Sequence, residues 1–246
     1  EQQMISLGER NVGYLAKVGE PLIQFYGYKT CGVWNSAEEI AANPHFSDDA
    51  PGGIRIVDTN NDGSLTPEDR VALGTPYPDF TWGITNTFQI KDFDISFLIQ
   101  GVQGSTVLNG DVYYNETKKW NKKYTKNRWV SAEHPGDGKT PYQNVKTGHD
   151  LMLTDYPLQN ASYACLRNFT VGYTLPATAA RKIKLSGVRF YVSGSNLLYI
   201  WGSGYKGINP ESRMTSGNYS SAMISGYQRG GFPLTSTISA GFDINF

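Results

Sequence analysis

The clearest chemical motif in the chain is a run of oxygen-bearing side chains at alternate positions between residues 58 and 69. In the twelve-residue calcium loop, side chains at positions 1, 3 and 5 and an acid at position 12 converge on one ion. A glycine at position 6, here Gly63, permits the sharp turn. The sequence therefore predicts one structural Ca²⁺ ion as a cofactor. Its expected oxygen ligands, the fourth through a backbone carbonyl, are Asp58, Asn60, Asp62, Ser64 and Asp69.

Two departures from the usual calcium loop leave a second interpretation open. Position 12 is Asp69 where glutamate is usual, and the preceding residues 54–57 have the pattern of a strand where a helix is usual. The next residues predict a helix start, with Thr66 as N-cap, Pro67 at the first helical position and Asp69 completing a capping box. The alternative to a metal site is a turn rich in Asp, Asn and Gly that binds no ion.

No arrangement of residues in the sequence predicts catalysis. His45, His134 and His149 lie in loop-like stretches without a second histidine or a cysteine at metal-binding spacing, which is typical of solvated histidines. Asp48 and Asp49 are adjacent acids in a polar loop, whereas the two carboxylates of a glycosidase flank the bond that they cleave. We therefore expect that the chain is not an enzyme.

Composition narrows the fold class and the partners. Lys plus Arg and Asp plus Glu each total 22 of 246 residues, and this zero net charge argues against nucleic acid as a partner. The 16 tyrosines against 4 methionines favour strands with aromatic faces. No apolar run approaches the roughly 18 residues of a membrane helix. Strands of a transmembrane β-barrel alternate apolar and polar residues and are compatible with this composition.

The cysteines and the first residue bear on the context of the chain. Cys31 and Cys165 are too few for a disulfide scaffold, and a single disulfide between them stays open. The chain begins at Glu1 without an initiator methionine. We therefore expect it to be a fragment of a longer protein.

Five stretches of the sequence alternate apolar and polar residues with the period of a β-strand. In the first of them, Trp82 and Ile84 share one face and Thr85 lies on the other. The polar break at Lys91 and Asp92 predicts a tight hairpin between the first two stretches. The five stretches cover residues 81–90, 92–101, 165–175, 188–198 and 234–246.

Long and short connections between these stretches alternate along the chain, with short turns at 91–92 and 176–186. Outer-membrane barrels have this arrangement, because their periplasmic turns are short and their extracellular loops are long. We therefore predict an all-β fold, an antiparallel transmembrane β-barrel with long extracellular loops. The expected segments are an extracellular region with the calcium-type loop (17–79), a hairpin (80–101), an extracellular loop (102–161), a second hairpin (162–198), another extracellular loop (199–233) and a C-terminal strand (234–246).

The long segments are rich in aromatic residues, which surface loops use for contacts with ligands. An alternative function is a secreted, calcium-braced β-sandwich that binds carbohydrate by stacking sugars on its tryptophans. The apolar strand faces separate the two functions, because these faces meet lipid in a barrel and a second sheet in a sandwich. The candidate substrate contacts are Trp34, Trp120, Trp129, Trp201 and Tyr205.

Several short motifs follow one another in order along nearly the whole chain. They are Val18-Gly19-Glu20-Pro21, Phe25-Tyr26-Gly27-Tyr28, Gly32-Val33-Trp34, Asp58-x-Asn-x-Asp-Gly, Glu68-Asp69-Arg70, Phe80-x-Trp82-Gly83, Arg167-Asn168-Phe169-Thr170-Val171-Gly172-Tyr173, Ser195-Asn196-Leu197 and Gly241-Phe242-x-Ile-x-Phe246. Together they resemble the SusC/RagA-type TonB-dependent transporters of Bacteroidetes.

This resemblance implies the C-terminal part of a 22-stranded barrel in the cell outer membrane, surrounded by outer-membrane lipid. It implies that the N-terminal plug domain and the TonB box are absent from this chain. A SusD-like lipoprotein is the implied partner, and the TonB complex and the proton-motive force would drive import of oligosaccharides or peptides. The five or six strands of this chain are too few to close such a barrel alone.

Overall fold

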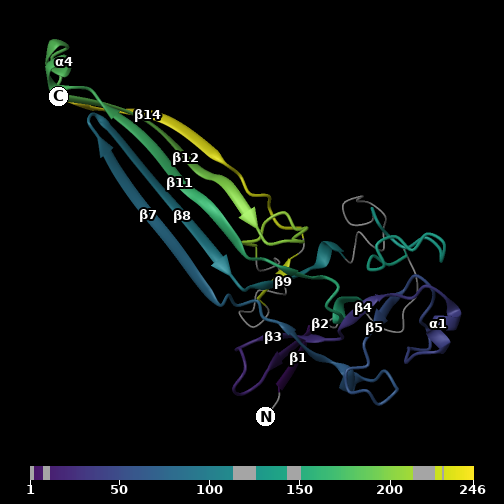
Figure 1. Cartoon of the computed structure of the whole chain (residues 1–246). Coiled ribbons are helices and arrows are strands. Elements are labelled where there is room, and N and C mark those ends of the chain that lie inside the picture. Colours follow the sequence, from purple (N-terminus) through teal and green to yellow (C-terminus); the bar gives the residue numbers. More distant parts are fainter. Residues whose placement is uncertain (1–2, 8–11, 113–125, 143–150, 213–224, 229) are drawn as a thin grey trace.

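The computed structural model describes residues 3–7, 12–112, 126–142, 151–212, 225–228 and 230–246. These residues form a long sheet and, at one end of it, a folded region built from shorter strands (Figure 1). No helix in the described residues is long and apolar enough to cross a membrane.

The long sheet has five strands in the order β14-β12-β11-β8-β7, and all neighbouring strands are antiparallel. Figure 1 shows that the strands run side by side over most of their length. Within these described residues, β7 and β14 are the edges of the sheet. The strand bounds are Phe80–Ile90 for β7, Phe93–Gln103 for β8, Tyr163–Thr174 for β11, Gly187–Trp201 for β12 and Thr237–Asn245 for β14.

Short connections join the strands at the end of the sheet away from the folded region. Strands β7 and β8 pair from Ile90 and Phe93 outward through a two-residue turn, in which Lys91 has a φ of 54°. This confirms the hairpin that the alternation predicts. Strands β11 and β12 are joined through the short helix α4, Ala177–Lys182. Strand β12 extends to Trp201, three residues beyond the stretch expected from the alternation.

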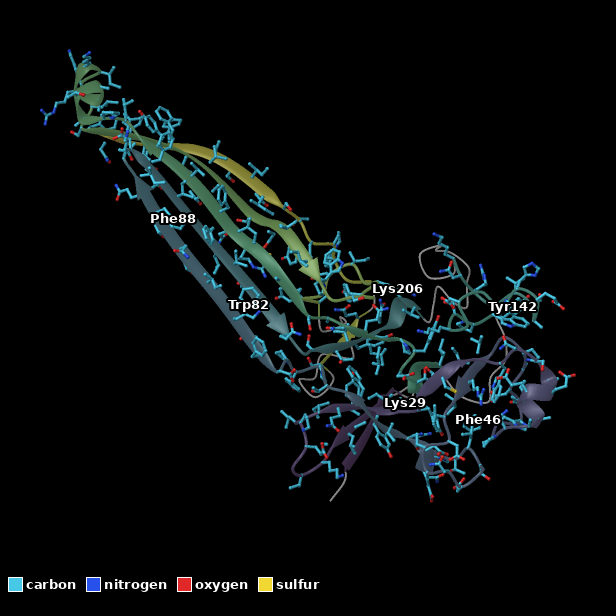
Figure 2. The ribbon with its side chains drawn as sticks, viewed as in Figure 1. Lys29, Phe46, Trp82, Phe88, Tyr142 and Lys206 are labelled. Carbon is cyan, nitrogen blue, oxygen red and sulfur yellow. The ribbon has the colours of Figure 1, made fainter. Side chains whose placement is uncertain are left out.

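One face of this sheet is apolar and uncovered, and we call it the outer face. Residues opposite each other in adjacent strands point to the same side, so the register assigns each side chain to a face. Trp82 and Phe88 lie along the edge strand in Figure 2. The large outer-face side chains are between 40% and 74% exposed. They include Phe80, Ile84, Phe88, Ile90, Phe93, Phe190, Val192, Leu198, Ile200, Ile238, Phe242 and Ile244.

An exposed apolar face of this extent is typical of a sheet that meets lipid. In a β-sandwich the same side chains would pack against a second sheet. No described element covers them, so the β-sandwich alternative does not fit. The opposite face, which we call the inner face, carries polar side chains such as Asp94, Thr170, Arg189 and Asp243.

The folded region contains more regular structure than the loops expected for residues 17–79, 102–161 and 199–233. It contains a sheet in the order β1-β2-β3-β6, a sheet β10-β9-β13 and a pair β4-β5. The bounds are β1 Gln3–Leu7, β2 Val12–Ala16, β3 Gln24–Gly27, β4 Thr30–Val33, β5 Ile54–Ile56, β6 Val71–Gly74, β9 Thr106–Asn109, β10 Leu158–Asn160 and β13 Tyr227–Gln228, with helix α1 Ala37–Ala41 and 3₁₀ turns η2 Pro67–Asp69 and η3 Leu151–Leu153.

Segments that are distant in the sequence share the core of this region. Tyr14, Phe25, Leu108 and Tyr227 belong to one buried cluster, so residues from β2, β3, β9 and β13 hold the region together. Cys31 is exposed and Cys165 is buried, and both are free thiols. The disulfide that the sequence leaves open is therefore not formed.

The outer face predicts how a charge acts on folding into lipid. Ile84 points outward and is 51% exposed, and its neighbour Thr85 points to the inner face at nearly the same depth. We expect Ile84→Lys to cost about 2–4 kcal/mol of folding free energy, because the ammonium would enter hydrocarbon. Urea titration of the intact protein in lipid vesicles measures this cost. Thr85→Lys is the matched control and should change the midpoint little. Equal effects of both substitutions would contradict the assignment of the faces.

Candidate functional site

The 58–69 loop is closed by its own hydrogen bonds. The Asp58 carboxylate accepts hydrogen bonds from the backbone N–H of Asn61 (2.7 Å) and of Gly63 (2.8 Å). The Asp62 carboxylate accepts a hydrogen bond from the N–H of Ser64 at 2.8 Å. Gly63 has a φ of 84°, so the backbone is in the left-handed conformation at the position where the motif requires glycine.

Asp69 is fully buried and holds both ends of this loop. One carboxylate oxygen accepts a hydrogen bond from the N–H of Thr59, and the other accepts from the N–H of Thr66, both at 2.8 Å. Thr66 and Asp69 form the predicted capping box, although the element that they cap is a 3₁₀ turn of 3 residues. Burial opposes ionisation of Asp69, but hydrogen bonds from Thr66, Thr59 and Asn60 outweigh it and lower its pKa.

The donor set of the loop fits a hard cation in its chemistry but is not gathered around one centre. Asn60 and Asp62 are exposed and Asp58 is half-buried; all three carry oxygen donors, and each carboxylate oxygen can accept more than one bond. The Asn60 amide nitrogen, however, donates to Asp62 at 2.8 Å. Among the described residues, no group of three or more His, Cys, Asp and Glu side chains is placed to hold a metal. The calcium site therefore stays a prediction.

Two charged clusters lie on the inner face of the long sheet. The first joins three strands through Arg189, whose Nη2 donates to Asp94 at 2.6 Å and whose Nη1 donates to Asp243 at 3.3 Å. Gly172 of β11 lies between Arg189 and Asp94, and a Cβ atom there would collide with both side chains. A glycine at this position therefore allows the ion pair to cross the intervening strand.

The second cluster lies near the folded region, around a bulge in β11. The guanidinium of Arg167 donates to Glu211 at 2.5 Å, to Asn196 at 2.6 Å and to the Tyr199 hydroxyl at 2.8 Å. Glu211 belongs to the segment that follows β12, so this ion pair attaches that segment to the inner face of the sheet. The register of β11 against β8 and β12 shifts between Leu166 and Asn168, next to Arg167.

A row of aromatic rings extends from the second cluster. Ile200 points outward, so Tyr199 and Trp201 on either side of it point to the inner face. Ring centroids lie 6.0 Å apart between Tyr163 and Tyr199, 6.5 Å between Tyr199 and Trp201, and 6.2 Å between Trp201 and Tyr205. Trp201 is 45% exposed, so part of its ring is available to a ligand.

Of the other candidate substrate contacts, Tyr205 belongs to this row, whereas Trp34 and Trp129 lie elsewhere in the structure. Trp34 is fully buried, donates its indole N–H to Asp49 at 3.2 Å and offers no ring face to a ligand. Trp129 is buried in a cluster of the folded region, and Tyr205 is buried with its hydroxyl on Gln228. Trp120 lies outside the described residues. Among the candidates within the described residues, Trp34, Trp129 and Tyr205 therefore act in packing, and Trp201 is exposed.

Sequence reasoning does not identify Arg167, Glu211, Tyr163 and Tyr199 as parts of this site. The alternation of β11 and β12 could have placed the two tyrosines on the inner face, but the bulge interrupts it. A cleft of about 570 Å³ in the folded region was also not expected from the sequence. Its lining includes Cys31, Asp137, Lys139, Tyr156 and Lys206.

The buried carboxylate of Asp69 predicts a local loss of stability on substitution. Asp69→Asn replaces one acceptor by an amide donor facing a backbone N–H, and we expect local opening of the 58–69 loop to become about 1–3 kcal/mol easier. Hydrogen exchange of the loop amides measures this free energy. Glu68→Gln removes a charge from the exposed neighbour and should leave the exchange unchanged.

The same carboxylate predicts a pH dependence of the loop. Because the pKa of Asp69 is lower in the folded loop, its stabilisation is complete above the ordinary aspartate pKa of about 4. It is lost as the pH falls further, through the folded-state pKa. The free energy of loop opening, taken from exchange relative to the intrinsic amide rate at each pH, should fall below about pH 4 in the unsubstituted protein and fall less in Asp69→Asn. The same fall in both proteins would contradict this role.

Comparison with known proteins identifies the relatives of this fold. No family model matches the chain. It is 31% identical over 239 residues to TonB-dependent receptor P26 and 30% identical over 240 residues to TonB-dependent receptor P3, both from Formosa agariphila. These alignments cover 93% and 94% of the chain, but 23% of each relative. The chain is also 27% identical over 157 residues to TonB-dependent receptor SusC of Bacteroides thetaiotaomicron, covering 63% of the chain and 15% of SusC.

Solved structures show the same fold. The RagAB peptide transporter matches with a TM-score of 0.68 at 19% identity, covering 99% of this chain and 25% of that chain. The RagAB peptide importer in its closed-closed state matches with a TM-score of 0.64 at 17% identity, covering 100% and 28%. This chain spans about a quarter of the length of these relatives. It is therefore a homologue of part of the SusC/RagA-type TonB-dependent receptors, and its long sheet corresponds to part of the β-barrel of these receptors.

Proposed function

We propose that this chain forms part of the wall and of the extracellular region of an outer-membrane importer that is energised through TonB. The observation that carries the proposal is the two-sided long sheet. Its outer face exposes apolar side chains such as Phe88 and Phe242, and its inner face holds ion pairs between charged residues of different strands. A soluble protein would lose stability by leaving this outer face in water, whereas a barrel wall requires lipid on one side and a polar lumen on the other.

The number of strands supports the interpretation that this chain forms a segment of a barrel wall and not a complete barrel. The edges β7 and β14 each have one paired side, and a barrel closes only when every strand is paired on both sides. The chain aligns with 23% of its receptor relatives. We infer that the remaining part of a longer receptor supplies the strands that extend both edges.

The two ends of the sheet differ, which supports an orientation. The turn at Lys91 and the α4 connection are short, and the folded region lies at the opposite end of the strands (Figure 1). In outer-membrane barrels the short connections are periplasmic and the elaborate ones are extracellular. We therefore propose that the folded region is extracellular, where it would meet a SusD-like lipoprotein.

The aromatic row and the Arg167 cluster support a polar substrate with flat surfaces. Trp201 offers part of an indole face, on which a sugar ring or a peptide side chain can stack. Arg167 and Glu211 place charges within the same cluster. Both substrate classes, oligosaccharides and peptides, fit this chemistry. RagAB, a structural relative, is a peptide transporter.

Uptake by intact cells tests the proposed function. Deletion of the gene for the full-length receptor should abolish growth on its oligosaccharide or peptide nutrient.

Dissipating the proton-motive force should stop uptake while surface binding persists. Removing the SusD-like lipoprotein should reduce capture. Uptake that persists without the proton-motive force would contradict active import, and a receptor that fractionates with soluble proteins would contradict the whole proposal.

The aromatic row leads to a prediction about uptake. Trp201→Ala removes the exposed ring from the inner face, and we expect about a tenfold weaker apparent affinity for substrate, because one stacking contact is worth about 1–1.5 kcal/mol. Concentration-dependent uptake of labelled substrate measures it. Ile200→Ala, at the adjacent outer-face position, is the control and should leave the affinity unchanged. Equal losses would show a general folding effect and contradict the assigned role.

We also propose that the 58–69 loop binds one Ca²⁺ as a structural brace, with Asp58, Asn60, Asp62, the Ser64 carbonyl and Asp69 as ligands. The oxygen-only donor set supports the ion, and the abundance of extracellular Ca²⁺ makes a weak site useful. The side chains of Asn60 and Asp62 would exchange their mutual hydrogen bond for the ion. Once bound, the ion would supply charge neutralisation and cross-linking of the loop, not chemistry.

Calcium binding predicts protection of the loop from proteolysis. In the wild-type receptor, chelation of Ca²⁺ should increase cleavage within residues 54–74. Asp58→Asn combined with Asp62→Asn should give that higher rate with or without calcium, because two charged ligands are lost. Asp48→Asn, at an exposed acid outside the loop, should retain the calcium response. If calcium changes neither cleavage nor heat stability of the wild type, the metal site is wrong.

A further inference from the structure

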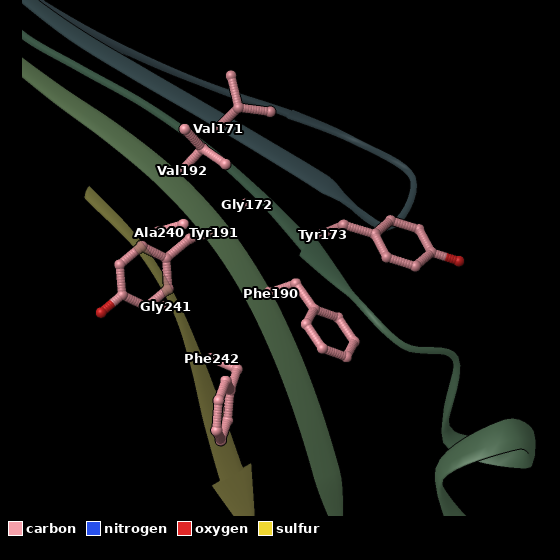
Figure 3. Close-up of a pocket in the computed structure, with 9 residues that line it drawn as sticks. All are labelled: Val171, Gly172, Tyr173, Phe190, Tyr191, Val192, Ala240, Gly241 and Phe242. Atoms are coloured by element: carbon pink, nitrogen blue, oxygen red, sulfur yellow. The ribbon is translucent and has the colours of Figure 1, made fainter. Parts of the chain in front are cut away.

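A groove crosses the outer face near the short connections of the sheet (Figure 3). Its volume is about 500 Å³, and it extends over β11, β12 and β14. Phe190 and Phe242 oppose each other in the register, and so do Val192 and Ala240. Ala240 is the smallest outer-face side chain of the groove, and it leaves room that a larger side chain would fill. The outer-face lining is Val171, Tyr173, Phe190, Val192, Ala240 and Phe242.

A basic turn lies at the same end of the sheet. Figure 3 shows a helix following the strand that carries Tyr173, beyond Phe190, and this helix is α4. Arg181 and Lys182 lie in its last turn and Lys184 follows it, and all three are exposed. Residues 176–188 contain no Asp or Glu, so their charge is not balanced within the turn.

The helix itself is fixed against the sheet. Ala180 of α4 is fully buried, and α4 contacts β12. Val188, the first outer-face residue of β12, is buried, in contrast to Phe190 and Val192 further along the strand. The basic turn therefore stands at the boundary where the uncovered apolar face ends, and Ile183 exposes an apolar side chain among its charges.

An apolar groove and a group of cations at the same end of the sheet match a ligand with a hydrocarbon chain and an anionic head. We propose that this site binds one anionic glycerophospholipid of the periplasmic leaflet, with an acyl chain in the groove and the phosphate at Arg181, Lys182 and Lys184. The occupant is a lipid because the groove opens on the face that meets the bilayer. The inference rests on the proposed function, which sets this sheet in the outer membrane with its short turns on the periplasmic side.

Competition between two lipids tests the site in the full-length receptor. Nanodiscs are made from equal amounts of phosphatidylglycerol and phosphatidylethanolamine, and native mass spectrometry measures which lipid stays bound. We expect the wild type to retain phosphatidylglycerol in preference. Joint substitution of Arg181, Lys182 and Lys184 by Ala should reduce that preference roughly tenfold or more, because each cation near a charged lipid surface is worth about fivefold. Lys91→Ala, at the other short turn, should leave it unchanged.

The groove is tested independently of the charges. Ala240→Phe fills it with an apolar side chain, so membrane insertion should persist while bound phosphatidylglycerol is lost. Ala164→Phe makes the same change on the outer face near the folded region and should retain the lipid. Equal retention of both lipids by the wild type, or no effect of Ala240→Phe and the triple substitution, would overturn the site.

The same samples separate the lipid site from the proposed function. Outer-membrane fractionation and uptake are measured for each variant. A wild-type receptor that inserts and transports but shows no lipid preference overturns the lipid site alone. A receptor that does not reach the outer membrane overturns the proposed function. Loss of a co-purifying acidic periplasmic protein in the triple variant, with lipid retention unchanged, would also overturn the lipid site.

Discussion

Lipid on one side of the long sheet is the constraint on which the rest of the structure depends. Hydrocarbon cannot hydrogen-bond the backbone, so the strands must satisfy each other and present apolar side chains outward. Alternation along each strand then leaves every second side chain for the inner face, as with Ile84 and Thr85 in β7. The same rule explains why the chain has few charged residues for its length and still contains charged clusters.

The inner face is organised by charges that reach across strands. Arg189 connects β12 to β8 and β14, and Gly172 leaves the space that this connection needs. Near the folded region, the bulge beside Arg167 shifts the register and allows its ion pair with Glu211. One cluster thus braces the sheet, while the other joins the sheet to the segment that precedes β13. Both clusters lie on the same face of the sheet, opposite the apolar one.

Sequence alone predicts the parts of this fold that depend on local periodicity. The β7–β8 hairpin and the capping box at Thr66 follow from neighbouring residues, and the structure has both. The folded region depends on pairing between distant segments in strands of two to five residues, which carry no measurable period. Residue type alone also does not predict that Trp34 is buried in the core and Trp201 is exposed to a ligand, because burial depends on tertiary neighbours. Arg189 and Asp94 are 95 residues apart in the sequence, so their ion pair becomes apparent only once the register of the paired strands is known.

The most direct test of the account is the access of lipid and water to successive residues of β7. Single nitroxide labels at residues 82–89 of the full-length receptor, with Cys31 and Cys165 replaced, report collisions with oxygen from the bilayer and with a water-soluble nickel complex. A membrane-spanning wall predicts alternation with a period of two, with residues 82, 84, 86 and 88 open to oxygen and residues 83, 85, 87 and 89 favouring the nickel complex. Water access to both sets of positions, or no alternation, would contradict a membrane-spanning wall.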